Sequence, residues 1–275
     1  MFKNHRWNEI DNGVDLKGKL SEDVVLEYIN YVTKCNQKIQ ECVDDEDEQT
    51  RYQKRAQTAS TISLKLKDQT FKGHIMNCCS EMFHDSKFFE KTDENPNLIG
   101  FENGVYDLQN DEFRDGLPDD YISFSTGIDY QEYSYEDQIV KDVLKFVSQV
   151  LPIPAVKDYV LKVMASFLTG KTGEEKFYIW TGSGGNGKSK LIELFELAFG
   201  DYCGKMSVTQ VTQKRAASNA CTPEILKNKG KRFVTLQEPD DDECIHVGAM
   251  KELTGGDKIQ ARGLHKDPVE FKPQW

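Results

Sequence analysis

One short run of the chain has glycine, lysine and serine at the spacing G-x-x-x-x-G-K-[ST]. It consists of Gly182, Ser183, Gly184, Gly185, Asn186, Gly187, Lys188 and Ser189. In such a loop the glycines let backbone N–H groups face phosphate oxygens, and the N-terminus of the following helix adds positive potential. Lys188 would reach the β- and γ-phosphates of a nucleotide, and the Ser189 hydroxyl would bind Mg²⁺. The run therefore predicts a site for ATP and Mg²⁺, against the alternative of a glycine-rich turn that binds nothing.

The residues on either side of this run predict the elements that would hold it. A short buried strand is expected before it, at Phe177, Tyr178, Ile179 and Trp180. A helix is expected after it, because apolar residues recur at helical spacing at Leu191, Ile192, Phe195 and Phe199. Strand, glycine loop and helix in this order are typical of kinases, GTPases, transporters and helicases alike, so the loop predicts a nucleotide but not its use.

A second apolar segment, "RFVTLQE", predicts a strand that ends near Glu238. If this strand lies beside the strand before the glycine loop, Glu238 would face the Mg²⁺ and the attacking water, which is the Walker B role. Asp240 is the next candidate for the catalytic acid. The alternative is an ordinary surface glutamate that follows a strand.

The last segment of the chain predicts a β-hairpin. Gly255, Gly256 and Asp257 turn the chain into "KIQAR", "HKDP" makes a second turn, and "VEF" returns. His265 and Lys266 would lie near the tip of this hairpin. The alternative is a plain turn that faces solvent, in which both residues are idle.

The first half of the chain predicts helices and then strands. Ser21 is expected to cap a helix with apolar residues from Val24 to Ile39, and a second helical stretch is expected over about 54 to 90. The turn dipeptide Asn103-Gly104 lies in a β-rich segment, and two amphipathic helices follow on either side of Pro152 and Pro154. Gly170 would stop the second of them. We therefore expect an α/β protein with a helical and β-rich domain at residues 1–153 and a nucleotide-binding domain at residues 154–275.

Composition narrows the class of protein. The net charge of −11 argues against a broad basic surface for nucleic acid, but "DDEDE" at 44–48 contributes five of the negative charges in one run that we expect to be a solvated loop. The seven cysteines include no C-x-x-C pair, which favours reduced thiols over a zinc ribbon. His74 and His84 do not have the spacing of a metal pair on one helix face. The sequence contains no apolar run of membrane-spanning length and does not begin like a signal peptide.

Three segments in order give a more specific indication. The succession of "GSGGNGKS", "RFVTLQE" and "KELTGGDKIQAR" resembles the superfamily III helicases, within them the helicase-primases of poxviruses and other large cytoplasmic DNA viruses, with relatives in phages. The segment "NPNLIGFENGVYDL" resembles the domain that precedes the helicase core in that group. The resemblance implies an AAA+-like P-loop ATPase core and a ring, usually a hexamer, with ATP bound between subunits.

The resemblance also implies roles for single residues. Lys188 and Ser189 would hold ATP and Mg²⁺, Glu238 would polarise the hydrolytic water, and the segment that meets DNA or a neighbouring subunit would contain Lys251, Arg262, His265 and Lys266. Single-stranded or forked DNA, replication proteins and the host cytoplasm are the expected partners and location. Gln237 departs from the family, where many relatives have a second acid before the catalytic glutamate.

The predicted function is therefore an ATP-dependent DNA helicase in viral or phage replication. The chain reaches Trp275 before a strand with the family's sensor asparagine and before its arginine finger, so we expect a C-terminally incomplete core that belongs to a longer polypeptide. Two alternatives stay open: a small-molecule kinase, which would need a substrate lid and an acceptor site, and a scaffold that binds ATP only to assemble.

Overall fold

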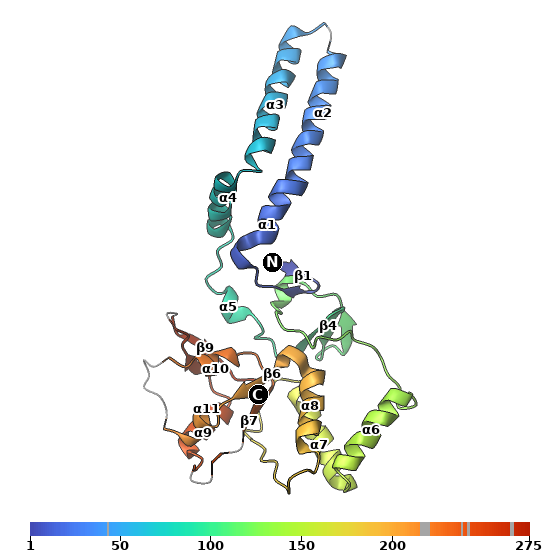
Figure 1. The fold of residues 1–275 in the computed structure, drawn as a ribbon, viewed down its shortest axis with the longest axis vertical. Helices are drawn as coiled ribbons and strands as arrows, with labels where there is room; N and C mark the ends of the chain where they lie inside the picture. Colours follow the sequence, from blue (N-terminus) through green and yellow to red (C-terminus); the bar gives the residue numbers. More distant parts are fainter. Residues whose placement is uncertain (43, 215–220, 238, 241–242, 265–266) are drawn as a thin grey trace. The chain divides into compact units, whose positions relative to one another are not determined.

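The computed structural model describes residues 1–42, 44–214, 221–237, 239–240, 243–264 and 267–275. The chain forms two compact units. One consists of Met1 and residues 9–86, and the other of residues 2–8 and 87–275. Figure 1 shows that the first unit is helical and that the second combines helices with small sheets.

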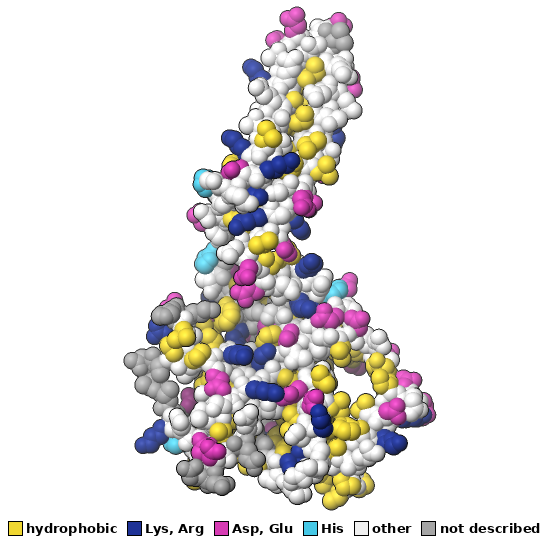
Figure 2. Space-filling view, in the orientation of Figure 1, with side chains coloured by type: hydrophobic (Ala, Val, Ile, Leu, Met, Phe, Trp, Pro, Cys, Tyr) yellow, Lys and Arg dark blue, Asp and Glu magenta, His cyan; other side chains and the backbone are white. Residues whose placement is uncertain are grey.

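The first unit is built around a helical hairpin. It begins with a 3-10 turn, Asp11–Gly13, followed by helix α1 (Val14–Lys19), a π-helical turn (Leu20–Val24) and helix α2 (Val25–Glu41). Helix α3 (Glu46–Lys65) runs back along α2, and helix α4 (Gln69–Met82) follows (Figure 1). Leu20, Val25 and Leu66 form its buried core. Hydrophobic side chains also remain on the surface along the hairpin (Figure 2).

Three expectations for this unit were wrong. The first helix begins at Val14, so Ser21 does not cap it; its hydroxyl instead donates to the Leu66 carbonyl and accepts from Lys72 Nζ. The acidic run is not a loop, because Asp45 caps α3 through the Glu48 N–H and the next three acidic residues form the first helical turn, where the helix dipole favours negative charge. The helical stretch expected over 54 to 90 is interrupted, because Asp68 accepts from the Phe71 N–H and starts a new helix there.

The second unit begins with two short hairpin strands, β1 (Phe2–Lys3) and β2 (Arg6–Trp7), and helix α5 (Phe88–Lys91) follows the first unit. A three-stranded antiparallel sheet then contains β3 (Leu98–Phe101), β4 (Gly104–Asp107) and β5 (Glu112–Arg114). Phe101 pairs with Gly104, so Glu102 and Asn103 form the turn between β3 and β4, and Gly104 of the predicted turn dipeptide begins β4. The β-rich segment is thus confirmed.

Helices and short strands alternate after this sheet. The two predicted amphipathic helices are present as α6 (Gln138–Val150) and α7 (Pro154–Phe167), and Pro154 occupies the first turn of α7, where a missing N–H costs nothing. Next come α8 (Lys188–Phe199), β6 (Cys203–Met206), α9 (Thr209–Thr212) and α10 (Pro223–Lys227). The last elements are β7 (Phe233–Leu236), α11 (Val247–Thr254), β8 (Ile259–Ala261) and β9 (Val269–Phe271).

Two hydrophobic clusters organise this unit. The first joins Ile99, Met164, Phe199, Tyr202 and Phe233, so β3, α7, α8 and β7 share one core. In the second, Leu253 of α11 packs with residues of α9, β8 and β9. The parallel pair β6–β7, linked through α9 and α10, and the surrounding helices are compatible with the predicted α/β class. The complete P-loop core and the division at residues 153/154 stay predictions.

The prediction of a strand before the glycine loop is wrong. Residues 177–180 are irregular, and Phe177 and Ile179 are 46% and 65% exposed. Only the alternate side chains turn inward: Trp180 packs against the first cluster and Tyr178 lies edge-on to Phe167. The segment has the inward and outward alternation of a strand but pairs with no described strand, so its apolar residues are not buried on both sides. No described helix of the protein has the length and apolar character needed to cross a lipid bilayer.

Candidate phosphate-binding loop

The glycine loop opens directly into α8. Gly187 precedes the helix with a φ of +86°, and a Cβ atom at this position would lie 3.0 Å from Val150 of α6. A side chain would therefore meet both an unfavourable backbone conformation and a neighbouring helix, which explains why glycine suits this position. Leu191, one turn later, is almost fully buried and fixes the start of α8 against the protein. The predicted order of loop and helix is confirmed, although the strand before them is not.

The amine of Lys188 points back into the loop. Its Nζ atom donates to the carbonyl oxygen of Gly182 at 3.1 Å and to Asn186 Oδ1 at 3.2 Å. A Cβ at Gly182 would lie 2.6 Å from Asn186 Nδ2 and 3.3 Å from Lys188 Nζ, so the absence of a side chain there leaves room for the amine. The loop therefore encloses a cation at the N-terminus of a helix, which is the arrangement that favours a phosphate.

The other side of the loop is open. A Cβ built on Gly184 or Gly185 would meet nothing within 4 Å, and the N–H groups of Gly185 and Gly187 donate to no other described backbone group. Ser189 is exposed in the first turn of α8. These residues fit the phosphates of ATP, because free backbone donors, an ammonium group and a hydroxyl converge at one helix N-terminus.

Helix α8 is tied to both parallel strands by a residue that the pattern did not predict. Glu196 Oε1 lies 3.2 Å from Lys205 Nζ of β6 and accepts from Thr235 Oγ1 of β7 at 3.5 Å. Phe199 at the end of α8 contacts Phe233 of β7, with 5.9 Å between the ring centroids. The predicted strand at 233–236 is thus present and lies beside the helix that starts at the loop.

Of the two acidic candidates after β7, the structure describes one. Glu238, the expected catalytic acid and metal ligand, lies outside the described residues. Asp240, the second candidate, is described, and its backbone N–H donates to Glu243 Oε2 at 3.1 Å. Among the described residues, no group of three or more His, Cys, Asp or Glu side chains could hold a metal ion. The Mg²⁺ site at Ser189 and Glu238 stays a prediction.

Three basic residues immediately before β7 are buried or half-buried, although no motif in the sequence marks them as functional. The Lys229 amine donates to the Thr92 carbonyl, and the Lys231 amine donates to the Asp201 carbonyl and lies 4.0 Å from the centre of the Phe124 ring. Burial lowers the pKa of both lysines. A run such as "KGKR" usually indicates a solvated basic surface, so only the fold identifies these side chains as internal donors to backbone carbonyls.

The largest of these donors is Arg232, which is 2% exposed. Its guanidinium donates to the carbonyls of Leu168 and Leu98, the latter at 2.6 Å, and more weakly to that of Asn95 at 3.3 Å. Leu98 begins β3 and Leu168 follows α7. Arg232 therefore joins the start of β7 to the antiparallel sheet and to the end of α7.

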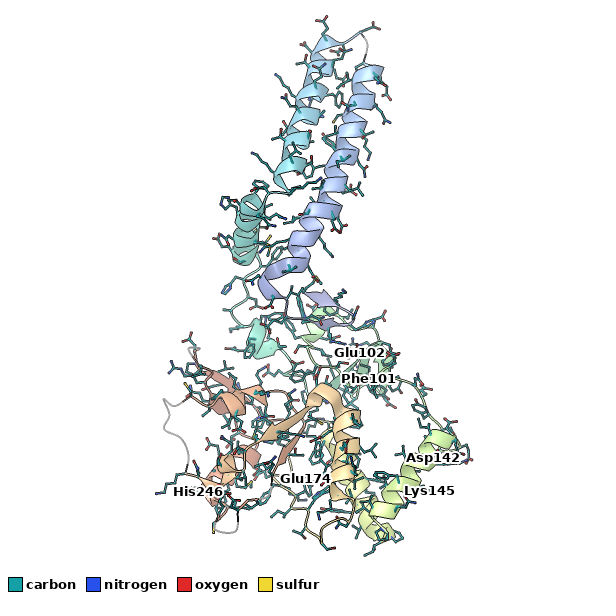
Figure 3. The ribbon with its side chains drawn as sticks, in the orientation of Figure 1. Phe101, Glu102, Asp142, Lys145, Glu174 and His246 are labelled. Carbon is teal, nitrogen blue, oxygen red and sulfur yellow. The ribbon has the colours of Figure 1, made fainter. Side chains whose placement is uncertain are left out.

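The antiparallel sheet has its own polar connections. Glu102, labelled beside Phe101 in Figure 3, accepts from Ser125 Oγ at 2.7 Å and pairs with Arg6 of β2 at 2.9 Å. These hydrogen bonds lower the pKa of the Glu102 carboxyl. The Gly100 N–H donates to the Tyr202 hydroxyl at 2.7 Å. This sheet is therefore fixed both to the N-terminal hairpin and to the turn that follows α8.

Two of the four expected DNA-contacting residues are described, and both adjoin residues of the second cluster. Lys251 is exposed in the last turn of α11, a helix that His246 (Figure 3) caps by accepting from the Ala249 N–H. Arg262 follows β8 directly, and its N–H donates to Thr222 Oγ1 at 3.0 Å. The predicted β8–β9 hairpin is confirmed, with Ile259 opposite Phe271. His265 and Lys266 lie outside the described residues, so a DNA contact at this hairpin stays a prediction.

Comparisons with known proteins agree with the three-segment resemblance. The family model described as "D5 N terminal like" matches residues 2–152. A protein of Acanthamoeba polyphaga mimivirus named "Putative helicase L207/L206" is 39% identical over 277 residues, which cover 100% of this chain and 28% of that protein. Invertebrate iridescent virus 6 has a protein named "Putative helicase 184R" that is 33% identical over 72% of this chain and 21% of its own length.

A more distant relative has a different name. "Putative primase C962R" of African swine fever virus is 21% identical over 80% of this chain and 23% of its own length. The chain thus spans about a quarter of the length of the curated relatives it matches. Because the family model covers more than half of the chain and the relatives come from large DNA viruses, the expected relationship is confirmed: this chain belongs to the D5 N terminal like family.

Proposed function

We propose that this chain is part of an ATP-dependent DNA helicase of the helicase-primase type that acts in viral DNA replication. The observation that carries the proposal is the position of Lys188, whose amine is held by Gly182 and Asn186 at the N-terminus of α8. The family adds support, since relatives that span the whole or most of this chain have names that contain helicase or primase.

Each residue of the loop has a distinct part in this proposal. Lys188 would exchange its two loop acceptors for phosphate oxygens, and the N–H groups of Gly185 and Gly187 would donate to the same phosphates. Ser189 and Glu238 would hold Mg²⁺, which when bound offsets the negative charge of the phosphates. Glu238 would orient and polarise the attacking water. Lys251, Arg262, His265 and Lys266 would meet single-stranded or forked DNA or a neighbouring subunit.

The proposal includes the assembly in which the whole protein works. We infer a ring, usually of six subunits, in which ATP lies between neighbours and an arginine finger from one subunit completes the site of the next. Replication proteins in the host cytoplasm would be its partners. Since an arginine finger contributes about 10³ to 10⁵ in turnover in GTPases, and since the neighbouring subunit would supply it, the 275-residue chain as an isolated subunit is expected to bind ATP weakly and not to unwind DNA. Robust strand separation by this chain alone would contradict that expectation.

Calorimetry of ATP binding tests whether Lys188 in the glycine loop holds the nucleotide. Lys188→Ala should abolish binding, because it removes the ammonium group that faces the phosphates. Lys190→Ala is the matched control: Lys190 is an exposed lysine two residues later, paired with Glu193 at 2.7 Å, and its loss should leave ATP affinity unchanged. Equal affinities of the wild-type chain and Lys188→Ala would show that the loop does not bind the nucleotide.

Hydrolysis distinguishes the proposal from its alternatives. The ATPase rate of the full-length protein is measured with and without single-stranded DNA. If the protein is a helicase, the DNA should increase this rate. If it is a small-molecule kinase the rate should not change, and if it is a scaffold no hydrolysis should be detected. Glu238→Gln should keep ATP bound but lose hydrolysis, because it removes the charge at the water without changing the loop. If the variant hydrolyses ATP as fast as the wild type, Glu238 is not the catalytic acid, and Asp240 is the next candidate.

A further inference from the structure

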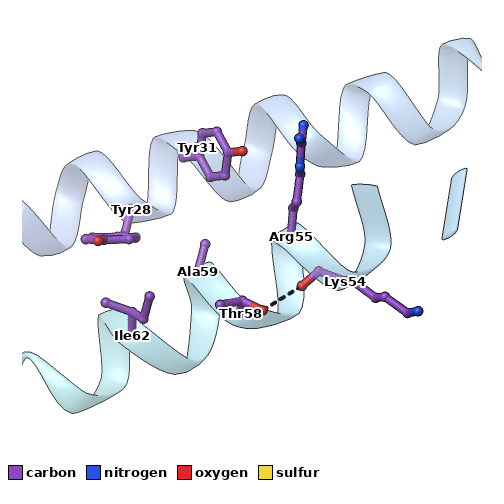
Figure 4. Close-up of a pocket in the computed structure, with 7 residues that line it drawn as sticks. All are labelled: Tyr28, Tyr31, Lys54, Arg55, Thr58, Ala59 and Ile62. Carbon is purple, nitrogen blue, oxygen red and sulfur yellow. Dashed lines mark hydrogen bonds between the residues drawn. The ribbon is translucent and has the colours of Figure 1, made fainter. Parts of the chain in front are cut away.

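The first unit, which is built around the α2–α3 hairpin, contains a groove that the proposed ATPase chemistry does not use. It lies between α2 and α3, is open to solvent and has a volume of about 330 Å³ (Figure 4). Ala59 and Ile62 of α3 form an apolar side, and Tyr28 of α2 lies opposite Ile62. Tyr31, one turn further along α2, is 44% exposed. The groove therefore presents one open aromatic ring beside an apolar floor.

Two cations of α3 complete the lining. Lys54 and Arg55 line the groove, and neither forms an ion pair with another described residue. In Figure 4 the Arg55 side chain points toward α2, whereas the Lys54 side chain points away from α2. The Arg55 guanidinium lies 5.6 Å from the centre of the Tyr52 ring, so it is already placed against an aromatic surface. In a chain with a net charge of −11, two cations without acidic partners at one apolar groove favour an anionic ligand.

The acidic groups of the hairpin are mostly elsewhere. Asp45 caps α3 and residues 46–48 form its first turn, at the end of the hairpin where α2 and α3 are joined. Glu27 is the exception, because it is exposed one turn before Tyr31 on α2. A polyanion would therefore cross α3 from Lys54, on the side of the helix away from α2, past Arg55 to Tyr31 (Figure 4).

We propose that this groove binds single-stranded nucleic acid, with a base stacked on Tyr31 and the adjacent phosphates on Lys54 and Arg55. An exposed ring beside lysine and arginine supplies both the stacking surface and the charge that sequence-independent binding of single strands requires. An acidic protein helix would bind to Lys54 and Arg55 without stacking on Tyr31. Loss of the Tyr31 ring should therefore weaken the binding of single-stranded nucleic acid but not that of an acidic helix. Only the identification of DNA as the natural strand rests on the proposed helicase function.

Fluorescence anisotropy with the 275-residue chain tests this site in the absence of ATP. The probe is a fluorescein-labelled oligothymidylate of about 16 nucleotides. Tyr31→Ala should weaken binding at least about fivefold, whereas Tyr31→Phe, which keeps the ring, should bind like the wild type. In the double variant Lys54→Ala/Arg55→Ala, the negative slope of log affinity against log salt concentration should become shallower by about 1.4. This is the change expected for the loss of two phosphate contacts on a single strand.

The controls separate the groove from general charge and from the nucleotide loop. Lys19→Ala combined with Lys67→Ala removes two exposed cations of the same unit that do not line the groove and should change the slope less. Circular dichroism should show the same helix content for all variants. The oligonucleotide test contains no ATP, and the calorimetry of Lys188→Ala contains no oligonucleotide, so a failure of the groove and a failure of the ATP site are distinguishable.

Any of four results would overturn the inference. The first three are the absence of oligonucleotide binding by the wild-type chain, equal binding by Tyr31→Ala and Tyr31→Phe, and equal slopes for the groove and control pairs. The fourth result comes from a competition experiment, in which a polyglutamate peptide displaces the oligonucleotide from the Tyr31→Ala and Tyr31→Phe chains. Equal displacement from both chains would show that the groove recognises charge alone, which contradicts base stacking.

Discussion

The Arg232 guanidinium lies over the ring of Tyr202, with 4.8 Å between the guanidinium carbon and the ring centroid, and both side chains are almost fully buried. Because the same guanidinium donates to carbonyls that adjoin β3 and α7, one side chain holds together the elements around β7. Burial lowers the pKa of Arg232 and raises that of the Tyr202 hydroxyl. The pair couples the antiparallel sheet to the strand expected to lead to the catalytic acid.

Arg232→Met should destabilise the second unit strongly. The change keeps an unbranched apolar stem but leaves the carbonyls of Leu168 and Leu98 without their donor, which costs about 1 to 3 kcal/mol for each buried acceptor. Urea unfolding followed by tryptophan fluorescence measures the loss, because Trp7, Trp180 and Trp275 all lie in this unit. Arg51→Met, at an exposed arginine of α3, is the control. A loss no larger than that of the control would show that Arg232 does not hold the unit together.

Two glycines of the loop should respond differently to alanine. Gly187 has a φ of +86° and a Cβ there would press on Val150, so Gly187→Ala should cost about 1 to 2 kcal/mol of stability and weaken ATP binding. Gly184→Ala is the matched control, because a Cβ there meets nothing within 4 Å. Thermal unfolding and ATP calorimetry on both variants check this. If Gly184→Ala were the more damaging substitution, the described loop geometry would be wrong.

The thiol of Cys203 should be unusually slow to alkylate. Burial, with a smaller effect from the nearby Glu196 carboxylate, raises its pKa to about 12, and the thiolate is the reactive form. Cys78 is exposed and serves as the internal reference. Mass spectrometry after timed treatment with iodoacetamide at about pH 8 should show Cys78 modified well before Cys203. Equal rates would mean that the first cluster opens readily around Cys203.

Asp93 should make stability depend on pH. Burial raises the pKa of its carboxyl, although the Ser123 hydroxyl and the N–H groups of Ser123 and Phe124 act in the opposite direction. An acid with a raised pKa keeps its proton in the folded state at pH values where the unfolded chain has lost it. Its contribution to the free energy of unfolding therefore falls as the pH rises from about 4 through the raised pKa.

Asp93→Asn removes this titration but not the surrounding packing. The destabilisation that it causes should be largest at the acidic end of that range and should shrink as the pH rises. Urea unfolding of the wild type and the variant at several pH values, followed by tryptophan fluorescence, measures the difference. A destabilisation that increases with pH would show that the carboxylate is stabilised in the folded protein instead.

The local elements could largely be predicted from sequence. Loop and helix at the glycine motif follow from glycines that must adopt positive φ and from apolar residues at helical spacing, and the hairpins follow from turn dipeptides between short apolar runs. The amphipathic spacing predicts helices α6 and α7, and Pro152 and Pro154 mark the boundary between them because proline disfavours a helix interior. These features depend on neighbours in sequence.

Tertiary contacts decided the rest. Residues 177–180 have strand-forming side chains, but a strand also needs a paired neighbour, which pattern cannot supply. Ser21 could cap a helix, yet helix α1 begins seven residues earlier and the hydroxyl binds across to Leu66. Arg232 has the sequence context of a surface cation, and it is internal only because carbonyls distant in sequence converge on it. Spacing along a chain determines which residues share a turn or a helix face, whereas partners 45 to 134 residues apart are determined only when the whole chain packs.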